Sequence, residues 1–393
     1  MVRKDSECSS CSSDSDHDHE DFTLANDLVV TKYQVAAEIT NAVLKEVISN
    51  VKEGAVVGDL CDLGDKSILA RTEKIYKKEK NLLKGIAMPT CISIDNTVCH
   101  YTPLRSDAPV VLKDGQVVKI DLGTHIDGFI ATAAHTVVVG ASKEKKVTGK
   151  VADLIRGAYD ALEVAIRTLR PDTVNYDVTK NIGKVSAEYG VTPVESMLSH
   201  QLERNVLEGE KQIIQNPGEK QKGDIEKCTI EKHEAYVIDI ILSTGKGQTK
   251  EMNTRTTVYR KNDQVNYQLK MKASRTLLHD INKQFGPMLF SLRNIEDEVK
   301  AKMGVVECEK NHLLIPYPVI YEKEGEFVAQ FKSTVLVMPN GLLKITGLPI
   351  DTDVYQSDLS IKDADLQKVL TSALKPKKKK EVKKSDPVAT KKG

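Results

Sequence analysis

Apolar residues recur three and four positions apart through the first patterned stretch of the chain, residues 27–50. That spacing places them on one face of an amphipathic helix, which ends near Gly54. A second helix is predicted over residues 60–80, whose last positions are rich in lysine. The patterned part of the chain therefore begins with a pair of helices.

Strand patterns follow this helix pair. Residues 87–103 predict a strand, a turn at Asp95 and Asn96, and a second strand. Residues 117–139 alternate apolar and polar positions on both sides of Gly123, which is typical of a long hairpin.

The same order then repeats. Two further helices are predicted over residues 151–170 and 175–190, closed by Pro171 and Gly190, and residues 233–247 again have a strand pattern. Two rounds of helix, helix and hairpin indicate a duplicated α+β unit whose sheets meet at a pseudo-twofold axis.

The pattern changes at residues 269–318, which predict two or three helices and a short apolar segment. We interpret them as an inserted helical subdomain of winged-helix type, after which the sheet resumes over residues 324–341. The predicted organisation is an acidic disordered head at 1–22, a main domain at 23–355 that contains the insert, and a C-terminal segment at 356–393.

Charge is unevenly distributed, although 57 basic and 56 acidic residues leave a net charge of only +1. Residues 1–22 hold seven acidic and two basic residues, and residues 375–393 hold nine lysines against two acidic residues. The tail has no apolar periodicity to offset the entropy of ordering, so we expect it to be disordered. Its lysines would attract RNA, an anionic membrane or a nuclear import receptor, or only keep the terminus soluble.

In the acidic head, Ser13 and Ser15 precede acidic residues and are candidate phosphoacceptors. A zinc site is the alternative, but an acidic segment without a folded frame is a poor place for one. Its ligands would be Cys8, Cys11, His17 and His19.

Composition excludes several classes of protein. A hydrophobic content of 40% is enough for a sizeable core, and 18 aromatic residues without tryptophan argue against a single-strand binder built on base stacking. No apolar run reaches the length of a membrane span, and none follows the first basic residues as a secretory signal requires. Seven scattered cysteines favour free thiols in a reducing compartment.

Four strand segments carry a more specific signal when they are considered together. They read KIDLGTH at 119–125, MLSHQL at 197–202, YVIDIILSTGKG at 236–247 and VAQFKSTVL at 328–336. In order and spacing they resemble the metal-site segments of type II methionine aminopeptidases. The chain resembles still more closely the proliferation-associated, growth-factor-receptor-binding relatives of those enzymes, and this resemblance implies the pita-bread (creatinase/aminopeptidase-like) fold.

The resemblance also implies where two metal ions would bind in an active relative, between two Asp, one His and two Glu. Two dications need several anionic oxygens, but this chain offers two carboxylates and one ammonium. We therefore predict a pseudoenzyme without metal or other cofactor; a residual one-metal hydrolase is the less favoured reading. The degenerate positions are Asp121, Thr132, His200, Asp239 and Lys332.

The remaining cleft residues fit the same interpretation. His100 matches a substrate-facing histidine of the family, whereas the second such histidine is replaced by Glu208. We expect His100 and His200 to be hydrogen-bonded cleft side chains. Lys332 is expected to form an internal ion pair with Asp121 or Asp239.

By resemblance, the protein is expected to bind structured RNA and ribosomes, to regulate translation, transcription and growth through protein partners, and to occupy cytoplasm, nucleus and nucleolus as a monomer. A protein-protein adaptor that uses the cleft is the alternative. A lysine cluster at 74–84 fits phosphate binding or an ordinary solvated surface. The candidate RNA contacts are Lys270, Lys272, Arg275, Lys377, Lys378, Lys379, Lys380, Lys383 and Lys384.

Overall fold

The computed structural model describes residues 21–218, 221 and 225–375. Most of the acidic head and nearly all of the lysine-rich tail lie outside the described residues. The predictions that fall there concern Cys8, Cys11, Ser13, Ser15, His17, His19, Lys377, Lys378, Lys379, Lys380, Lys383 and Lys384.

One nine-stranded sheet organises the main domain, with the strand order β1-β3-β4-β15-β9-β7-β8. Strand β15, late in the sequence, lies at its centre and pairs with β4 of the first half and β9 of the second. The strands on this path are β1 (Lys84–Ile94), β3 (Val117–Ile126), β4 (Phe129–Val138), β15 (Val328–Met338), β9 (Glu234–Ser243), β7 (Leu198–Leu202) and β8 (Gln212–Ile214). Strands β16 (Gly341–Lys344) and β6 (Thr192–Pro193) pair with β15 and β9.

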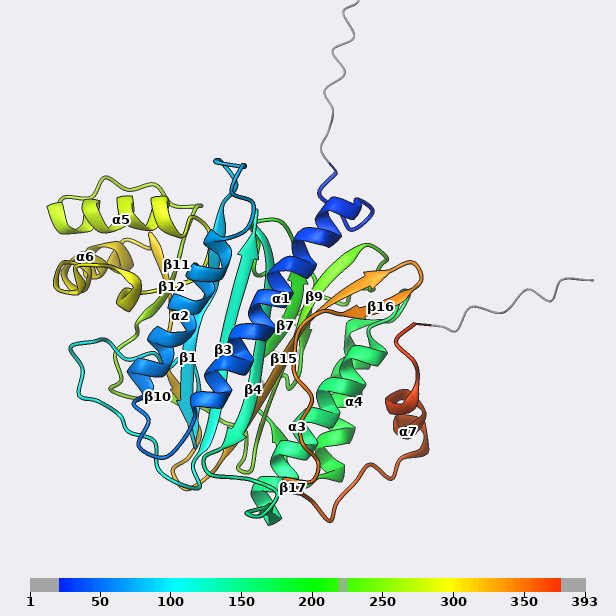
Figure 1. The fold of residues 1–393 in the computed structure, drawn as a ribbon. Coiled ribbons are helices and arrows are strands. Elements are labelled where there is room, and N and C mark those ends of the chain that lie inside the picture. The colour runs from blue at the N-terminus through cyan, green and yellow to red at the C-terminus, as the bar shows by residue number, and fades with distance from the viewer. Residues whose placement is uncertain (1–20, 219–220, 222–224, 376–393) are drawn as a thin grey trace, which may run out of the picture.

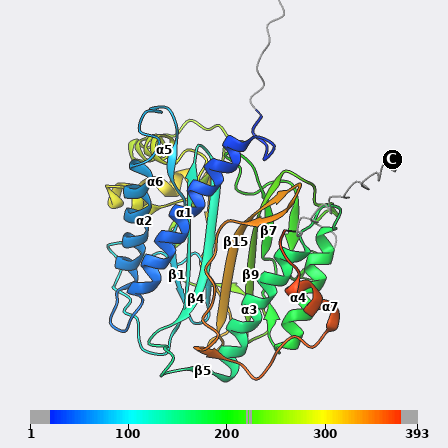
Figure 2. The same ribbon diagram turned by 45° about the vertical axis from the view of Figure 1, so that its right-hand side comes forward.

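Four long helices cover one face of this sheet (Figures 1 and 2). The first pair, α1 (Asp27–Asn50) and α2 (Val57–Glu73), packs on β1, β3 and β4, and α1 has the predicted bounds. The second pair, α3 (Gly149–Thr168) and α4 (Asn175–Glu188), packs on the other half of the sheet. The predicted repetition of helix pair and strands is therefore present.

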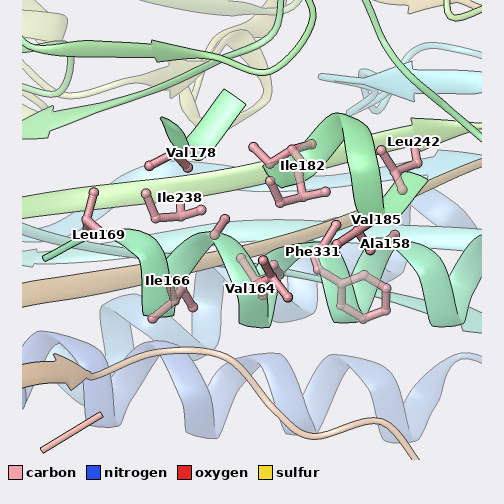
Figure 3. Close-up of a cluster of buried hydrophobic side chains, with 14 of the residues drawn as sticks. Ala158, Val164, Ile166, Leu169, Val178, Ile182, Val185, Ile238, Leu242 and Phe331 are labelled. Atoms are coloured by element: carbon pink, nitrogen blue, oxygen red, sulfur yellow. The ribbon is translucent and has the colours of Figure 1, made fainter. Parts of the chain in front are cut away.

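Buried aliphatic and aromatic side chains join the second helix pair to the sheet (Figure 3). Ile166 and Ile182 come from the helices, and Ile238 and Phe331 come from β9 and β15. All four are at most 1% exposed. Because burial of each such side chain stabilises the fold by about 1.5–3 kcal/mol, this cluster fixes the position of β9 and β15.

The hairpin predicted over residues 117–139 is present as β3 and β4. Its turn is Asp127 and Gly128, with φ of 54° and 82°, a pair of left-handed residues that suits the twist of a two-residue hairpin loop. Gly123 lies inside β3 opposite Thr132, where a Cβ would come 2.5 Å from the Thr132 side chain. The glycine therefore permits close strand packing and does not form the turn.

The second predicted helix also ends early, because α2 stops at Glu73 instead of residue 80. The amide of Lys74 returns to carbonyls of the last turn, and Tyr76 then takes a left-handed φ of 47°. A backbone that leaves the helical region in this way cannot continue the helix.

The insert is a unit of helices and a small sheet with its own core. Strand β11 (Val258–Lys261), which precedes the predicted start at residue 269, is the central strand of that sheet. The other elements are α5 (Lys272–Gln284), β12 (Phe290–Ser291), the short 3-10 helix η1 (Leu292–Asn294), α6 (Glu298–Lys310) and β13 (Leu314–Tyr317). Figure 1 shows the unit at one end of the sheet.

Short elements complete the fold. They are β2 (Thr97–Cys99), β5 (Val147–Thr148), β10 (Lys250–Glu251), β14 (Ile320–Tyr321), β17 (Tyr355–Gln356) and α7 (Ala364–Thr371).

No helix within the described ranges is both long and apolar enough to cross a membrane.

Candidate functional site: a cleft with an internal ion pair

A row of four residues crosses the middle of the large sheet at one level. Asp121 of β3 lies opposite Ala134 of β4, Ala134 lies opposite Lys332 of β15, and Lys332 lies opposite Asp239 of β9. Residues directly opposite in antiparallel strands point to the same face of the sheet. The register therefore gathers three charged side chains, and the small Ala134 leaves room for Lys332 to reach across to Asp121.

The Lys332 ammonium contacts both carboxylates. Its Nζ lies 2.6 Å from Asp121 Oδ2 and 3.0 Å from Asp239 Oδ2. The Lys332 and Asp121 side chains are only 12% and 4% exposed. The sequence predicted a pair with one aspartate or the other, and the structure has both.

Gln330 is a member of this cluster that the sequence reasoning missed. Its Nε2 donates to Asp239 Oδ1 and Oδ2 at 3.0 and 3.1 Å, and it lies 3.4 Å from Asp121 Oδ2. The signal was present in the segment VAQFKSTVL, because residues two apart on a strand share a face. Gln330 had to point where Lys332 points.

Two carboxylates that share one ammonium leave an excess negative charge. Burial would lower the pKa of Lys332, but Asp121 and Asp239 outweigh it and raise that pKa above its ordinary value. Burial raises the pKa of Asp239, and the neighbouring Asp121 adds to this effect, although Lys332 opposes it. Lys332 is therefore charged at neutral pH. The excess negative charge of the two carboxylates helps to raise the pKa of Asp239.

These residues do not fit a dinuclear metal centre. Lys332 Nζ lies where a cation would have to approach Asp121 and Asp239, and like charges a few ångströms apart repel. Thr132, two residues from Ala134 on β4, supplies a hydroxyl at the position where the resemblance led us to expect a carboxylate. Among the residues that the structure describes, no three His, Cys, Asp or Glu side chains are grouped so as to hold a metal ion.

A cavity of about 300 Å³ adjoins the ion pair. Lys332, Gln330 and Asp239 form part of its polar wall, and the apolar wall includes Met88, Leu207, Val237, Ile241 and Leu289. Apolar side chains form one part of the wall, and polar and charged groups from several strands converge on the other part, an arrangement that suits a small ligand or a peptide side chain.

Both candidate histidines line this cavity. His100 donates its Nδ1 hydrogen to the carbonyl oxygen of Pro318 at 3.1 Å, and His200 Nδ1 faces the carbonyl oxygen of Gln201 at 3.4 Å. Burial lowers the pKa of His100 to about 4 and also lowers that of His200. Each imidazole is therefore neutral at pH 7 and has a backbone partner.

Glu208, where the resemblance led us to expect a second histidine, joins the cleft to the insert. Its two carboxylate oxygens accept from the Tyr317 hydroxyl at 2.6 Å and from Arg260 Nη2 at 3.1 Å. Arg260 belongs to β11 and Tyr317 to β13. An interaction of this kind links segments more than fifty residues apart, so the sequence pattern could not reveal it.

The candidate RNA contacts on the insert lie together at the start of α5. The exposed Lys270 and Lys272 flank the N-cap residue Met271, and Arg275 donates to the carbonyl oxygens of Leu269 and Lys270. Arg275 therefore stabilises the backbone of this turn and also contributes a positive charge to it. In the cluster at 74–84, four lysines line a separate concavity of about 620 Å³ after α2: Lys74, Lys77, Lys80 and Lys84.

Comparison with known proteins identifies a family and several similar proteins. Residues 31–268 match metallopeptidase family M24. Proliferation-associated protein A of Dictyostelium discoideum is 44% identical over 356 residues, 91% of either chain. ERBB-3 binding protein 1 of Arabidopsis thaliana is 43% identical and covers 93% of this chain, with 92% of its own length aligned.

A solved structure of a thermophilic Arx1 superposes with a TM-score of 0.83 at 31% identity, covering 89% of this chain and 100% of that one. The expected resemblance to the proliferation-associated group and the pita-bread fold are both confirmed by these matches.

Proposed function

This chain belongs to metallopeptidase family M24, and from that premise we propose that it is a non-catalytic, aminopeptidase-like scaffold. One observation carries the proposal: the Lys332 ammonium lies 2.6 Å and 3.0 Å from Asp121 and Asp239, two of the positions that the resemblance to active aminopeptidases assigns to metal ligands. A fold that retains the cleft but lacks the metal-binding groups can still bind other molecules.

The scaffold binds structured RNA and ribosomes, in ribosome biogenesis and translation, and acts in growth and transcription regulation through protein partners. The cationic start of α5 supports the RNA part, because lysines that surround a helix start neutralise phosphates without reading bases. The relatives named proliferation-associated protein A and ERBB-3 binding protein 1 support the growth and partner part. A protein with this role is expected in the cytoplasm, the nucleus and the nucleolus.

An adaptor that holds a peptide in the cleft is the second candidate. The cavity of about 300 Å³ beside Asp239 and Gln330 favours it, because an emptied active site with an apolar wall can still receive a side chain. Peptide-array binding that survives deletion of residues 375–393 and is lost on narrowing the cavity, for example with V237F, would favour the adaptor.

The test of the non-catalytic assignment uses purified full-length protein supplied with Co²⁺ or Mn²⁺. We expect no tightly bound metal by elemental analysis and no release of Met from a peptide. The variant T132D/D239E/K332E restores the carboxylate set, so it is expected to retain metal. K323E makes the same charge change as K332E at an exposed lysine and should behave like wild type. Turnover by the wild-type protein that is lost in H200A would overturn the proposal.

The test of RNA binding compares salt dependence. K270E/K272E and a chain ending at residue 374 are each expected to weaken binding to a structured ribosomal RNA fragment and to flatten the slope of log affinity against log salt. K362E/K368E is the matched charge change at two exposed lysines of the C-terminal segment, and it should leave the slope closer to wild type.

Sedimentation of tagged protein with ribosomes, before and after RNase, provides the cellular counterpart of this measurement. Unchanged affinity and slope in both variants, together with no ribosomal sedimentation, would remove RNA binding from the proposal.

A further inference from the structure

The acidic head joins the described structure beside the lysine cluster at 74–84. Asp21 and Phe22 line a concavity of about 530 Å³ whose wall also includes Lys80 and Leu82. Lys80 and Leu82 also line the concavity of about 620 Å³ after α2, which we call the lysine concavity. The two concavities therefore share a wall. Figure 1 shows the start of α1 and the end of α2 at the same end of the sheet.

The first described residues are held in place by several contacts. The Arg204 guanidinium lies 4.3 Å from the centre of the Phe22 ring, a cation–π contact. Asp21 Oδ1 accepts the backbone amide of Thr23 at 2.8 Å, and the Asp21 carbonyl oxygen accepts from the side chain of Asn26 at 3.0 Å. The head therefore leaves the domain from a defined point next to the lysine concavity.

Apolar side chains fix the loop that carries the lysines. Ile75, Tyr76 and Leu82 pack against a buried cluster formed by α1, β3 and β4. Because these side chains face inward, the polar residues between them face solvent. The exposed lysines of the loop are Lys74, Lys77, Lys78 and Lys80.

The positive charge of the lysine concavity is not neutralised within the described part of the chain. Its wall contains four lysines against two glutamates, an excess of two positive charges: Lys74, Lys77, Lys80, Lys84, Glu73 and Glu79. None of these lysines has a carboxylate partner among the described residues, whereas Arg71 near the end of α2 pairs with Glu46 at 3.0 Å. The lysine side chains are therefore available to an anionic ligand.

The neighbouring concavity beside Asp21 offers no such excess. Lys32 and Arg204 both pair with Asp127, at 2.6 and 2.7 Å. Its wall holds three cations and three carboxylates in all. An acidic segment that enters at Asp21 therefore meets its first unpaired positive charge at Lys80, on the wall shared with the lysine concavity.

The head supplies complementary charge close to its point of attachment. Residues 14–20 contain four acidic residues and no lysine or arginine: Asp14, Asp16, Asp18 and Glu20. Since a chain spans at most about 3.6 Å per residue, Asp18 and Glu20 stay within about 11 Å of Asp21. At least two of the four carboxylates therefore remain close to the shared wall.

We propose that residues 14–20 dock in the lysine concavity of the same chain, with their carboxylates against Lys74, Lys77 and Lys80. The tether favours this occupant, because it gives the head an effective concentration near the millimolar range, whereas a second copy or an RNA binds from dilute solution. The docked segment covers cations that are otherwise open to phosphates. Because the ion pairs are solvent-exposed, added salt releases the segment.

Tryptophan-induced quenching tests this docking, because the chain contains no tryptophan of its own. Full-length protein carries N81W at the shared wall and a bimane label on Cys11, and C8S and C228S keep the label at that position. Tryptophan quenches bimane only near contact. Cys11 can lie up to about 36 Å from Asp21, so the tether alone does not impose contact. We expect quenching at about 0.05 M NaCl that falls at least twofold at about 0.5 M.

Substitutions in the lysine concavity should release the head. K74A/K77A/K80A should reduce quenching at least twofold at low salt. The matched variant K52A/K113A/K323A removes three exposed lysines elsewhere and should leave quenching nearly unchanged. Equal quenching in the two variants would overturn the proposal, and unchanged melting of both shows that the fold is intact.

Substitutions in the head provide the reciprocal comparison. D18N/E20Q removes two carboxylates next to the point of attachment and should reduce quenching more than D5N/E7Q, which removes two distant ones. Combined with K74A/K77A/K80A, D18N/E20Q should cause little further loss, because both changes remove the same ion pairs. Fully additive losses would contradict a direct contact.

Two further outcomes would assign the head to another partner and overturn the proposal. Quenching that arises only when a labelled chain without N81W is mixed with an unlabelled N81W chain would place the head on a second copy. Quenching that appears only in a chain ending at residue 374 would show that the full-length protein pairs its head with the lysine-rich tail. None of these measurements includes RNA, so their result is independent of the proposed RNA function.

Discussion

Two buried cations, Lys332 in the cleft and Arg293 at the base of the insert, each lie between two aspartates, but their surroundings differ. Arg293 is 1% exposed, and it donates to Asp62 Oδ1 at 2.9 Å and to Asp65 Oδ2 at 2.8 Å. Asp65 also accepts from Asn294 at 2.7 Å and from the Thr90 amide at 2.8 Å. Both oxygens of Asp65 are therefore satisfied, and the cluster joins η1 of the insert to α2.

The Lys332 cluster differs in its exposure to the cavity. Among the described residues each cluster leaves one buried polar atom without a partner, Asp121 Oδ1 in one and Arg293 Nε in the other, but only the Lys332 cluster borders the cavity of about 300 Å³. A lysine is a point charge, whereas the planar guanidinium of Arg293 can bond two carboxylates and a carbonyl at fixed angles. The comparison indicates that the arginine cluster stabilises the contact between α2 and the insert, whereas the lysine cluster neutralises carboxylates at the edge of a cavity.

The strongest test of this comparison is R293M. It leaves the carboxylate of Asp65 without its cation, whereas Asp62 keeps Lys66 and Arg105. Because Asp65 is 2% exposed, the free energy of unfolding should fall by about 3–5 kcal/mol. Denaturant unfolding followed by circular dichroism measures this loss. R105M, which removes the half-exposed partner of the same Asp62, should cost about 1 kcal/mol or less. Equal losses in the two variants would contradict the assignment of an architectural role to Arg293.

K332M should have a smaller effect, about 2 kcal/mol, because the cavity admits solvent and Asp239 can bind a proton. The pKa of Asp239 is already raised, and loss of the ammonium raises it further. The destabilisation is present while Asp239 is ionised and shrinks as pH falls through its raised pKa. Unfolding at pH 7 and pH 5 measures this, with the exposed K323M as control. A pH-independent loss would show that lost packing dominates.

The smallest effect is expected at His100 of the cleft. Burial lowers the pKa of this histidine from 6.5 to about 4. A base with a lowered folded-state pKa contributes stability that is present above pH 6.5 and lost as pH falls toward 4. H100N suits the left-handed φ of 64° and should reduce the acid-induced loss between pH 6.5 and 5 by about 1 kcal/mol. The exposed His279 provides the control H279N, and an identical pH profile in H100N would show that His100 does not titrate in this way.

Local pattern accounts for most of the helices and strands. The apolar spacing of residues 27–50 reproduced the bounds of α1, and the segment VAQFKSTVL lies in β15. Boundaries that depend on backbone geometry were less predictable. The hairpin turn lies at Asp127 and Gly128 because both residues accept a positive φ, whereas the conspicuous Gly123 serves strand packing.

For the site, the sequence by itself determined which chemical groups are available: the ammonium of Lys332, the hydroxyl of Thr132, the carboxylates of Asp121, Asp239 and Glu208, and two imidazoles. Only the tertiary structure decided how they combine. Strand register brings Lys332 between Asp121 and Asp239, and the docking of the insert brings Arg260 and Tyr317 to Glu208. Side-chain chemistry is local to each residue, but ion pairing depends on distance between residues far apart in the chain. That distance is set by packing of the whole fold.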